Sequence, residues 1–304
     1  MTLLLPSADG VADHVSARFP QAEVLRYEDG ARDGLADVTF YCLPYMGDSA
    51  SVELIASMPG LTAIQSLSSG VDDVLAAVPE AVTLCNGRGL YHEEGTADLA
   101  VALILASLRQ LPRFVRQQAE RTWQHVRTQS VDSKRVLLVG AGYIGSGIAQ
   151  RLAPFGACIS KVSRTARADV MPLSELRRMA SESDILVICI ALSPQTRGLI
   201  DASVLAALPD GALVVNVARG PVVDAGALAA ELASGRLSAA LDVTDVEPLP
   251  PDRPEWTLPN VLITPHVGGD TTQFAGRAAS FVAEQVARHL AQQPLMNVVK
   301  PGLT

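Results

Sequence analysis

The sequence predicts an α/β protein with two domains, in each of which helices cover a parallel sheet. Short apolar runs alternate with helix-length segments along the chain, which is the pattern of strands and helices in such sheets. The alternation occurs in two series, and the length of 304 residues agrees with two domains because a domain averages about 150 residues. Apolar residues make up 48% of the chain and aromatic residues only 4%, so both cores are expected to be mainly aliphatic.

The first series covers residues 1–90 and predicts a small parallel sheet. Gly, Pro and Asp separate its apolar runs, as expected for turns between strands and helices. The predicted strands are Thr2–Leu5, Val24–Tyr27, Val38–Leu43, Ala63–Ser66 and Val82–Leu84.

A long apolar helix is predicted from Thr96 to Leu108, where it connects the two series. Its most apolar part, Leu99–Leu108, is about half as long as a membrane span. A polar segment rich in Gln and Arg follows from Arg113 to Lys134, and no helix or strand is assigned to it.

The second series begins at Arg135 and has the alternation of a doubly wound parallel sheet. A last helix, predicted at Thr272–Gln292, leads to Met296–Val299, and this tail is long enough to return to the first series and complete its domain. The predicted strands are Val136–Val139, Ile159–Val162, Ile185–Ala191, Leu213–Val217, Ala239–Val243 and Val261–Thr264, and the predicted helices are Ile144–Phe155, 173–181, 201–208 and 224–234.

A glycine-rich loop lies between the first strand and the first helix of the second series. It has the pattern GxGxxG, with Gly140, Gly142 and Gly145. The first glycine permits a tight turn, the second lets the backbone approach a pyrophosphate, and the third lets helix and strand pack closely. The helix opens with Tyr143 and Ile144, and its N-terminal N–H groups can bind phosphates. We therefore expect a dinucleotide site rather than a glycine-rich turn without a ligand.

These observations predict two Rossmann-like, doubly wound parallel-sheet domains. Residues 96–272 are expected to bind the dinucleotide. Residues 1–95 and 273–304 are expected to form a smaller, flavodoxin-like substrate domain that the C-terminal helix completes.

The segment after the next predicted strand bears on the choice between the two nicotinamide cofactors. An NAD site has Asp or Glu roughly 20 residues after the glycines, but Ser163 holds this position here. Arg164 and Thr165 follow, and Lys161 and Arg167 complete a local basic cluster that could pair with a 2′-phosphate. We expect NADP(H) as the preferred cofactor and NAD(H) as the alternative cofactor. The alternative is that these arginines are ordinary solvated side chains and that cofactor choice is loose.

Three polar segments follow predicted strands of the second series at their carboxyl ends, where open α/β sheets bind ligands. They contain Arg219, Glu247 and His266. With these segments, nearly the whole chain resembles the D-isomer-specific 2-hydroxyacid dehydrogenases. The segments that carry the resemblance are Ser69–Asp72, Gly140–Gly145, Ser193–Gly198, Asn216–Gly220, Asp242–Pro250 and Thr264–His266.

The resemblance implies a role for each matching residue. Arg219 binds the substrate carboxylate and polarises the 2-oxo oxygen, and His266 is the general acid in reduction and the base in oxidation. Glu247 pairs with His266 and keeps its charged form available near neutral pH. Asp242 holds the nicotinamide carboxamide. The other residues implied at the cofactor are Ile190, Val217, Ala218, Gly268 and Gly269, and those implied at the substrate carboxylate are Ser69, Gly70 and Val71.

The implied reaction is the reduction of a small 2-oxo acid, such as glyoxylate or hydroxypyruvate, to the D-2-hydroxy acid, and its reverse. Oxidation of formate or phosphite on the same fold is an alternative, although formate-oxidising relatives pair the histidine with Gln. A nucleotide-sensing binding protein of the corepressor type is another. The sequence does not identify the substrate, the physiological direction, or the roles of Tyr45, Met46 and the Tyr91–Glu94 segment.

Charge and cysteine content indicate the partners and the compartment. The net charge of −8 disfavours binding to nucleic acid or to an anionic membrane. The four cysteines have no CxxC spacing and no histidine cluster accompanies them, so neither a metal site nor a disulfide framework is expected. A cytoplasmic location fits these reduced cysteines and an N-terminus without signal-peptide features. The family resemblance also implies a homodimer, with the long apolar helix at its interface.

Overall fold

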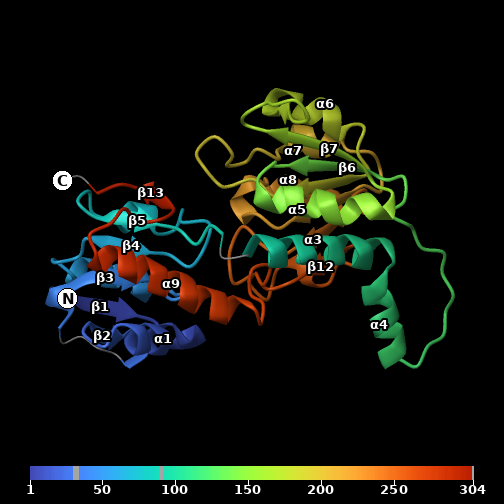
Figure 1. Cartoon of the computed structure of the whole chain (residues 1–304). Coiled ribbons are helices and arrows are strands. Elements are labelled where there is room, and N and C mark those ends of the chain that lie inside the picture. Colours follow the sequence, from blue (N-terminus) through green and yellow to red (C-terminus); the bar gives the residue numbers. More distant parts are fainter. Residues whose placement is uncertain (30–33, 90–91, 303–304) are drawn as a thin grey trace. The chain divides into compact units, whose positions relative to one another are not determined.

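The computed structural model describes residues 1–29, 34–89 and 92–302 (Figure 1). The chain divides into two compact units, of which the first comprises Met1–His92 and Asp270–Thr304 and the second comprises Glu93–Gly269. The sequence placed these junctions at 95/96 and 272/273, so both come slightly earlier in the chain than expected.

The seven-stranded sheet of the second unit is parallel throughout, with the strand order β12-β11-β10-β9-β6-β7-β8. Its first strand, β6, pairs with β7 on one side and with β9 on the other, which is the strand order of a Rossmann sheet. The strands are β6 (Arg135–Val139), β7 (Cys158–Ser163), β8 (Met171–Pro172), β9 (Ile185–Ile188), β10 (Leu213–Asn216), β11 (Ser238–Leu241) and β12 (Val261–Ile263).

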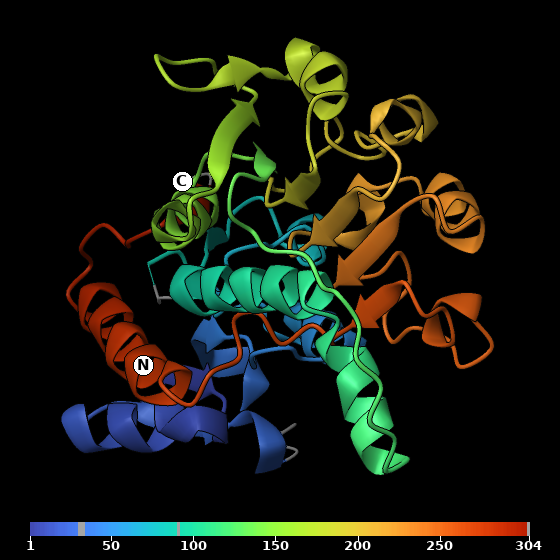
Figure 2. The same ribbon diagram turned by 90° about the vertical axis from the view of Figure 1, so that its right-hand side faces the viewer.

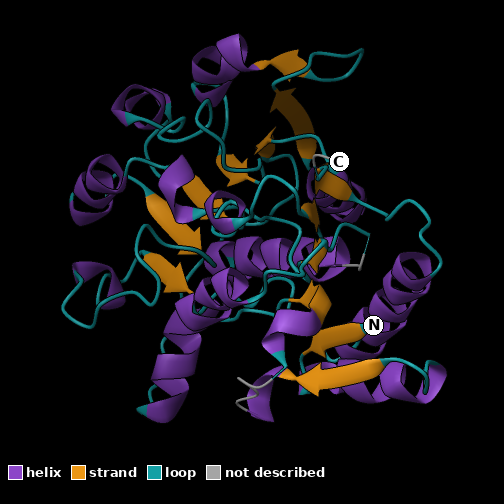
Figure 3. Ribbon diagram, turned by 90° about the vertical axis from the view of Figure 1, so that its left-hand side faces the viewer, coloured by secondary structure: helices purple, strands orange, loops and turns teal. Residues whose placement is uncertain are grey.

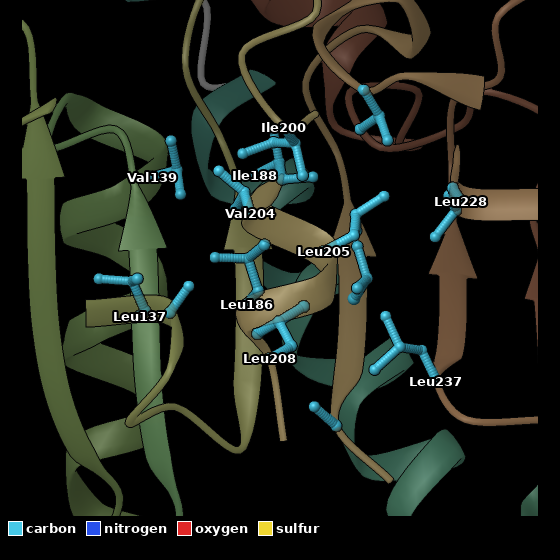
Figure 4. Close-up of a cluster of buried hydrophobic side chains, with 14 of the residues drawn as sticks. Leu137, Val139, Leu186, Ile188, Ile200, Val204, Leu205, Leu208, Leu228 and Leu237 are labelled. Atoms are coloured by element: carbon cyan, nitrogen blue, oxygen red, sulfur yellow. The ribbon is translucent and has the colours of Figure 1, made fainter. Parts of the chain in front are cut away.

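Helices cover both faces of this sheet, which explains why its strands read as continuous apolar runs. Successive side chains of a strand point to opposite faces. In β6, Leu137 and Val139 therefore join the core under one set of helices, and Val136 and Leu138 join the core under the other. Figures 2 and 4 show the two layers and the first of these cores. One face carries α6 (Leu176–Ala180), α7 (Ala202–Ala207) and α8 (Ala225–Ala233), and the other carries α3 (His92–Leu108) and α5 (Tyr143–Leu152).

The six-stranded sheet of the first unit has the order β13-β5-β4-β3-β1-β2. Its five parallel strands follow the flavodoxin-like order, as predicted. One face is covered by α1 (Val11–Arg18) and by the C-terminal helix α9 (Phe274–Leu290), so the chain's end completes this core, and α2 (Ser49–Glu53) is a short helix after β3. The strands are β1 (Thr2–Leu5), β2 (Glu23–Arg26), β3 (Val38–Cys42), β4 (Ala63–Gln65), β5 (Thr83–Cys85) and β13 (Val298–Lys300). Figure 3 distinguishes strands from helices in both units.

Several elements were not predicted individually from the sequence, among them β13, β8 and α4 (Leu111–Ala119). β13 pairs antiparallel with β5 as an edge strand, and both Val298 and Val299 are exposed, so no buried apolar run marked it. β8 has only two residues. The helix α4 overlaps the start of the polar segment at 113–134, to which no element was assigned, because its few apolar residues form no buried face.

Within the described part of the chain, no helix is both long enough and apolar enough to cross a membrane. The same residues contain no group of His, Cys, Asp and Glu side chains that could hold a metal ion.

Candidate active site

The glycine loop is built by close packing between β6 and β9. Gly140 has φ of 120°, and a Cβ there would lie 2.6 Å from the carbonyl oxygen of Cys189. A Cβ at Gly145 would collide with the carbonyl oxygen of Gly140. Burial raises the pKa of Cys189 to about 12, so its thiol stays protonated and donates to Gly140 O at 3.3 Å. The close contacts require glycine at positions 140 and 145, and the hydrogen bond from Cys189 fixes the loop against β9.

The N-terminus of α5 has the features of an anion site. Its N-cap is Gly142, which supplies no side-chain cap, whereas Asp201 and Asp224 cap α7 and α8. A Cβ at Gly142 would meet no atom within 4 Å, so the space next to the first helical turn is open. Uncapped N–H groups at a helix start bind anionic groups well, and the residues present therefore fit the pyrophosphate of a dinucleotide.

The predicted basic cluster at the end of β7 is only partly available for a ligand. Lys161 Nζ lies 3.0 Å from Asp169 Oδ2, and the guanidinium of Arg167 donates to the carbonyl oxygen of Ala141. Ser163 Oγ donates to Thr165 O at 2.7 Å and stabilises the turn after the strand. Among the residues that the structure describes, Arg164 has neither a hydrogen-bond nor an ion-pair partner and is exposed. Of the three basic residues expected at a 2′-phosphate, Arg164 alone has no partner among the described residues and is uncommitted, that is, available to bind a ligand. The spacing of these residues in the sequence could not have shown this difference.

His266 and Glu247 form a close pair of titratable side chains. His266 Nδ1 lies 2.7 Å from Glu247 Oε2, and Thr244 N donates to Glu247 Oε1 at 3.0 Å. Burial favours the neutral form of Glu247, but the hydrogen bond and charge of His266, the Thr244 amide and the charge of Arg219 outweigh it, so its pKa lies below the ordinary value. An ionised carboxylate only accepts hydrogen bonds, so the proton in this contact belongs to His266 Nδ1.

The loop that carries His266 is held in an unusual backbone conformation by Asp242. His266 has φ of 53°, a left-handed conformation that is uncommon for residues other than glycine. Asp242 is buried, and its carboxylate accepts from Thr264 Oγ1 at 2.6 Å and from the N–H groups of Val267 and Gly268 at 2.9 Å each. His266 N itself donates to Asp242 O at 2.9 Å. Bonds on both sides of His266 therefore fix its position.

Asp242 was expected at the nicotinamide carboxamide, and that role stays a prediction. The structure adds three hydrogen bonds to its carboxylate that sequence reasoning did not foresee. The signal available in the sequence was a single carboxylate at the end of an apolar strand, which indicates a functional position without naming its partners.

Arg219 follows β10, and Asn216 shapes the turn that presents it. Asn216 is buried at the strand end, where its Oδ1 accepts from Ala218 N at 3.0 Å and its Nδ2 donates to Arg219 O at 3.1 Å. Arg219 Nη1 donates to Ala218 O at 2.9 Å, and its charge contributes to the lowered pKa of Glu247. Asn216 was noted in the sequence as part of the Asn216–Gly220 segment but was given no role, although a buried Asn at a strand end is a recognisable signal.

The remaining residues predicted at the cofactor differ in burial and in hydrogen bonding. Ile190 and Val217 are buried members of the two cores, and Ala218 is half-buried. Gly268 donates its N–H to Asp242, and Gly269 is the last residue of the second unit.

The predicted substrate loop, Ser69–Val71, lies in the first unit after β4. Within the described part of the chain, the backbone N–H groups of these three residues donate no hydrogen bond. Ser69 Oγ is buried and likewise has no partner among the described residues. Unpaired N–H groups on consecutive residues form a concave site suited to an anion such as a carboxylate.

Tyr45 and Met46 differ in their surroundings. The ring of Tyr45 packs against Phe274, with 4.4 Å between ring centroids, so packing accounts for it. Met46 is half exposed and has φ of 53° in the loop after β3. Tyr91 lies outside the described residues. Glu94 forms part of α3 and pairs with Arg151, so the C-terminal end of the expected polar loop belongs to a helix.

A Rossmann sheet with an uncapped glycine loop, and a histidine–carboxylate pair and an arginine after its strands, defines a class of nicotinamide-dependent oxidoreductases. Comparisons with known proteins narrow this class. Residues 101–268 match the model of the D-isomer specific 2-hydroxyacid dehydrogenase, NAD binding domain. Hydroxyphenylpyruvate reductase of Plectranthus scutellarioides is 32% identical over 98% of this chain and 97% of its own. A glyoxylate/hydroxypyruvate reductase A of Arabidopsis thaliana is 34% identical over 82% of each chain.

Solved structures agree with these matches. A D-isomer specific 2-hydroxyacid dehydrogenase of Xanthobacter autotrophicus, in complex with NADPH and MES, is 32% identical over 99% of this chain and 98% of its own, with a TM-score of 0.80. The chain belongs to the D-isomer specific 2-hydroxyacid dehydrogenase family. It is accordingly an NAD(P)-dependent enzyme, and its relatives support the reduction of 2-oxo acids as its general reaction.

Proposed function

We propose that this enzyme reduces a small 2-oxo acid to the D-2-hydroxy acid, with NADPH as the preferred reductant and with Arg219, His266 and Glu247 as catalytic residues. The observation that carries the proposal is the 2.7 Å contact between His266 Nδ1 and an ionised Glu247 near Arg219. A histidine so paired can hold a proton for the substrate on its other ring nitrogen, Nε2.

Each residue of this set meets one requirement of the reaction. When bound, the reduced nicotinamide supplies the hydride that the carbonyl carbon accepts. Negative charge develops on the substrate oxygen, where the guanidinium of Arg219 stabilises it and His266 Nε2 delivers a proton. Glu247 stabilises the imidazolium through Nδ1 before the transfer and keeps the ring oriented after it.

The cofactor would be held by the loop of Gly140, Gly142 and Gly145 and by the first turn of α5, with Ser163, Arg164 and Thr165 around the 2′-phosphate. The uncapped helix start and the uncommitted side chain of Arg164 support this assignment. The unpaired N–H groups of Ser69–Val71 support a role for that loop in receiving the substrate carboxylate.

The test is an assay of the wild-type enzyme with NADPH or NADH against a panel of 2-oxo acids, followed at the absorbance of the reduced nicotinamide. We expect turnover with small members such as glyoxylate and hydroxypyruvate, and a higher kcat/KM with NADPH. Cofactor binding without turnover of any member would contradict the proposal and favour a nucleotide-sensing protein. Reduction of NADP⁺ by phosphite or formate would indicate the other alternative.

The NADPH preference makes a prediction about Arg164. Replacing Arg164 with alanine removes the uncommitted cation at the end of β7, and a hydrogen bond to a charged group is worth about 1.5–3 kcal/mol. The KM for NADPH should therefore rise about 10- to 100-fold, while the KM for NADH changes by less than about twofold. The control is Arg177→Ala, which removes another exposed arginine of the same unit. Equal losses for both cofactors in Arg164→Ala would overturn the assignment.

We also propose that the enzyme is a homodimer, in which a second copy covers α4 and the segment after it. Leu111 and Val115 of α4 are 49% and 64% exposed, and Trp123 is 100% exposed. Three large apolar side chains exposed within one short segment are typical of a surface that a partner covers. We expect a solution mass of about twice 32.0 kDa, and a concentration-dependent shift toward the monomer in Val115→Glu. A wild-type mass of 32.0 kDa at every concentration would contradict the dimer.

A further inference from the structure

A fully buried glutamine, Gln285, interrupts the apolar face of the C-terminal helix α9. Its side chain is 0% exposed and is held by hydrogen bonds to two other segments of the first unit. Its Oε1 accepts from Met296 N at 2.9 Å, and its Nε2 donates to Met296 O at 3.0 Å and to Gln65 Oε1 at 2.6 Å. A buried amide of this kind is costly unless each polar atom is paired, and here both atoms are paired.

Gln65 continues these bonds across the ends of two strands. It is the last residue of β4 and is also 0% exposed. Its Nε2 donates to Ser66 O at 2.7 Å and to Asn86 O at 3.0 Å. The side chain therefore links the carboxyl ends of β4 and β5, next to the loop that follows β4.

Asn86 makes the last connection, to the predicted substrate loop. Its Nδ2 donates to Ser69 O at 2.9 Å, and its own N–H donates to Asn297 O at 3.1 Å. In a trans peptide, the C=O and the following N–H point in opposite directions. Holding Ser69 O toward Asn86 therefore turns the N–H of Gly70 away from Asn86, and this N–H is one of the three that have no partner among the described residues.

We infer that Gln285, Gln65 and Asn86 are positioning residues that orient the Ser69–Val71 loop for the substrate carboxylate. The inference rests on the proposed function of that loop. It gives the C-terminal helix a role in substrate affinity in addition to its role in the core. Each bond lies within the first unit, so the network orients the loop without involving the residues that bind the dinucleotide.

Two variants test the inference through kinetics. Asn86→Ala removes the donor to Ser69 O without adding a negative charge beside the proposed carboxylate site, and it also removes Asn86 Oδ1, which accepts from Arg88 N at 3.2 Å. Gln285→Leu removes the connection to α9. Because a hydrogen bond contributes about 0.5–1.5 kcal/mol, each variant should raise the KM for the 2-oxo acid about 3- to 10-fold. The KM for NADPH and kcat should stay within about twofold.

The control is Glu284→Gln at the neighbouring, partly exposed position of α9, where the side chain pairs with Arg288, and it should leave every constant unchanged. A lower Tm in both variants with an unchanged KM for the 2-oxo acid would mean that the network only stabilises the fold. If Gln285→Leu does not fold, Asn86→Ala still decides the question. Failure of the wild-type enzyme to reduce any 2-oxo acid would overturn the proposed function together with this inference. If the wild type is active and the variants keep its KM for the 2-oxo acid, the inference alone is overturned.

Discussion

Replacing His266 with alanine is expected to slow 2-oxo acid reduction by about 10²–10⁴-fold, the range that general acid catalysis contributes. The variant loses the only proposed proton donor to the substrate oxygen, while the glycine loop and the first turn of α5 are untouched. Cofactor affinity should therefore remain near that of the wild type. Steady-state kinetics with the best 2-oxo acid, together with NADPH titration by fluorescence, measures both quantities.

Two further variants show whether the loss comes from the proton donor. His14→Ala changes an exposed histidine of the first unit and should have no effect on turnover. Glu247→Gln keeps a hydrogen-bonding side chain beside His266 but removes the charge that stabilises the imidazolium, so it should reduce kcat by less than His266→Ala does. Turnover that persists in His266→Ala would show that the general acid lies elsewhere.

The second large effect is expected for Arg219→Gln, which should lower kcat/KM by about 10²–10³-fold. Charge stabilisation at the substrate oxygen is lost in the transition state, and the bond to the substrate carboxylate is lost in the ground state. Both kcat and KM should therefore change in Arg219→Gln, whereas in His266→Ala mainly kcat should fall. Initial-rate measurements over a range of 2-oxo acid concentrations separate the two constants.

Lysine at the same position provides the matched comparison. Arg219→Lys keeps the charge but loses the planar, bidentate donor pair, so its kcat/KM should lie between those of the wild type and the glutamine variant. Arg219→Gln should also raise the pKa of Glu247 slightly, because the charge of Arg219 helps to lower it in the wild type. Equal activity of the lysine and glutamine variants would contradict an electrostatic role.

The fold was predictable because the local signals agree with the tertiary arrangement. Strands buried on both faces, such as β6 and β9, must be apolar at every position, and they read as continuous apolar runs. The glycine loop was equally clear, because Gly140 and Gly145 occupy places where any side chain would collide with backbone. The fold class and the family are confirmed, and the individual site residues stay predictions.

Elements without a buried apolar run could not be predicted. β13 is stabilised by backbone hydrogen bonds to β5 from a segment far away in the sequence, and its valines are exposed. The availability of the basic residues after β7 was also hidden, because it depends on which partner each side chain finds. Arg167 bonds to Ala141 and Lys161 to Asp169, and neither contact follows from residue spacing.

The sequence by itself determined the two α/β domains, the dinucleotide loop and the family, because each depends on residue type at short, regular spacing. The tertiary structure decided which groups are held and which are free. It placed the carboxylate of Asp242 where it accepts hydrogen bonds from the residues around His266, which has a left-handed conformation. It also brought Gln285 into hydrogen-bond contact with Gln65, which lies 220 residues earlier in the sequence and precedes the Ser69 loop. Such contacts arise only when β-strands and helices distant in the chain pack together, so no local pattern in the sequence can encode them.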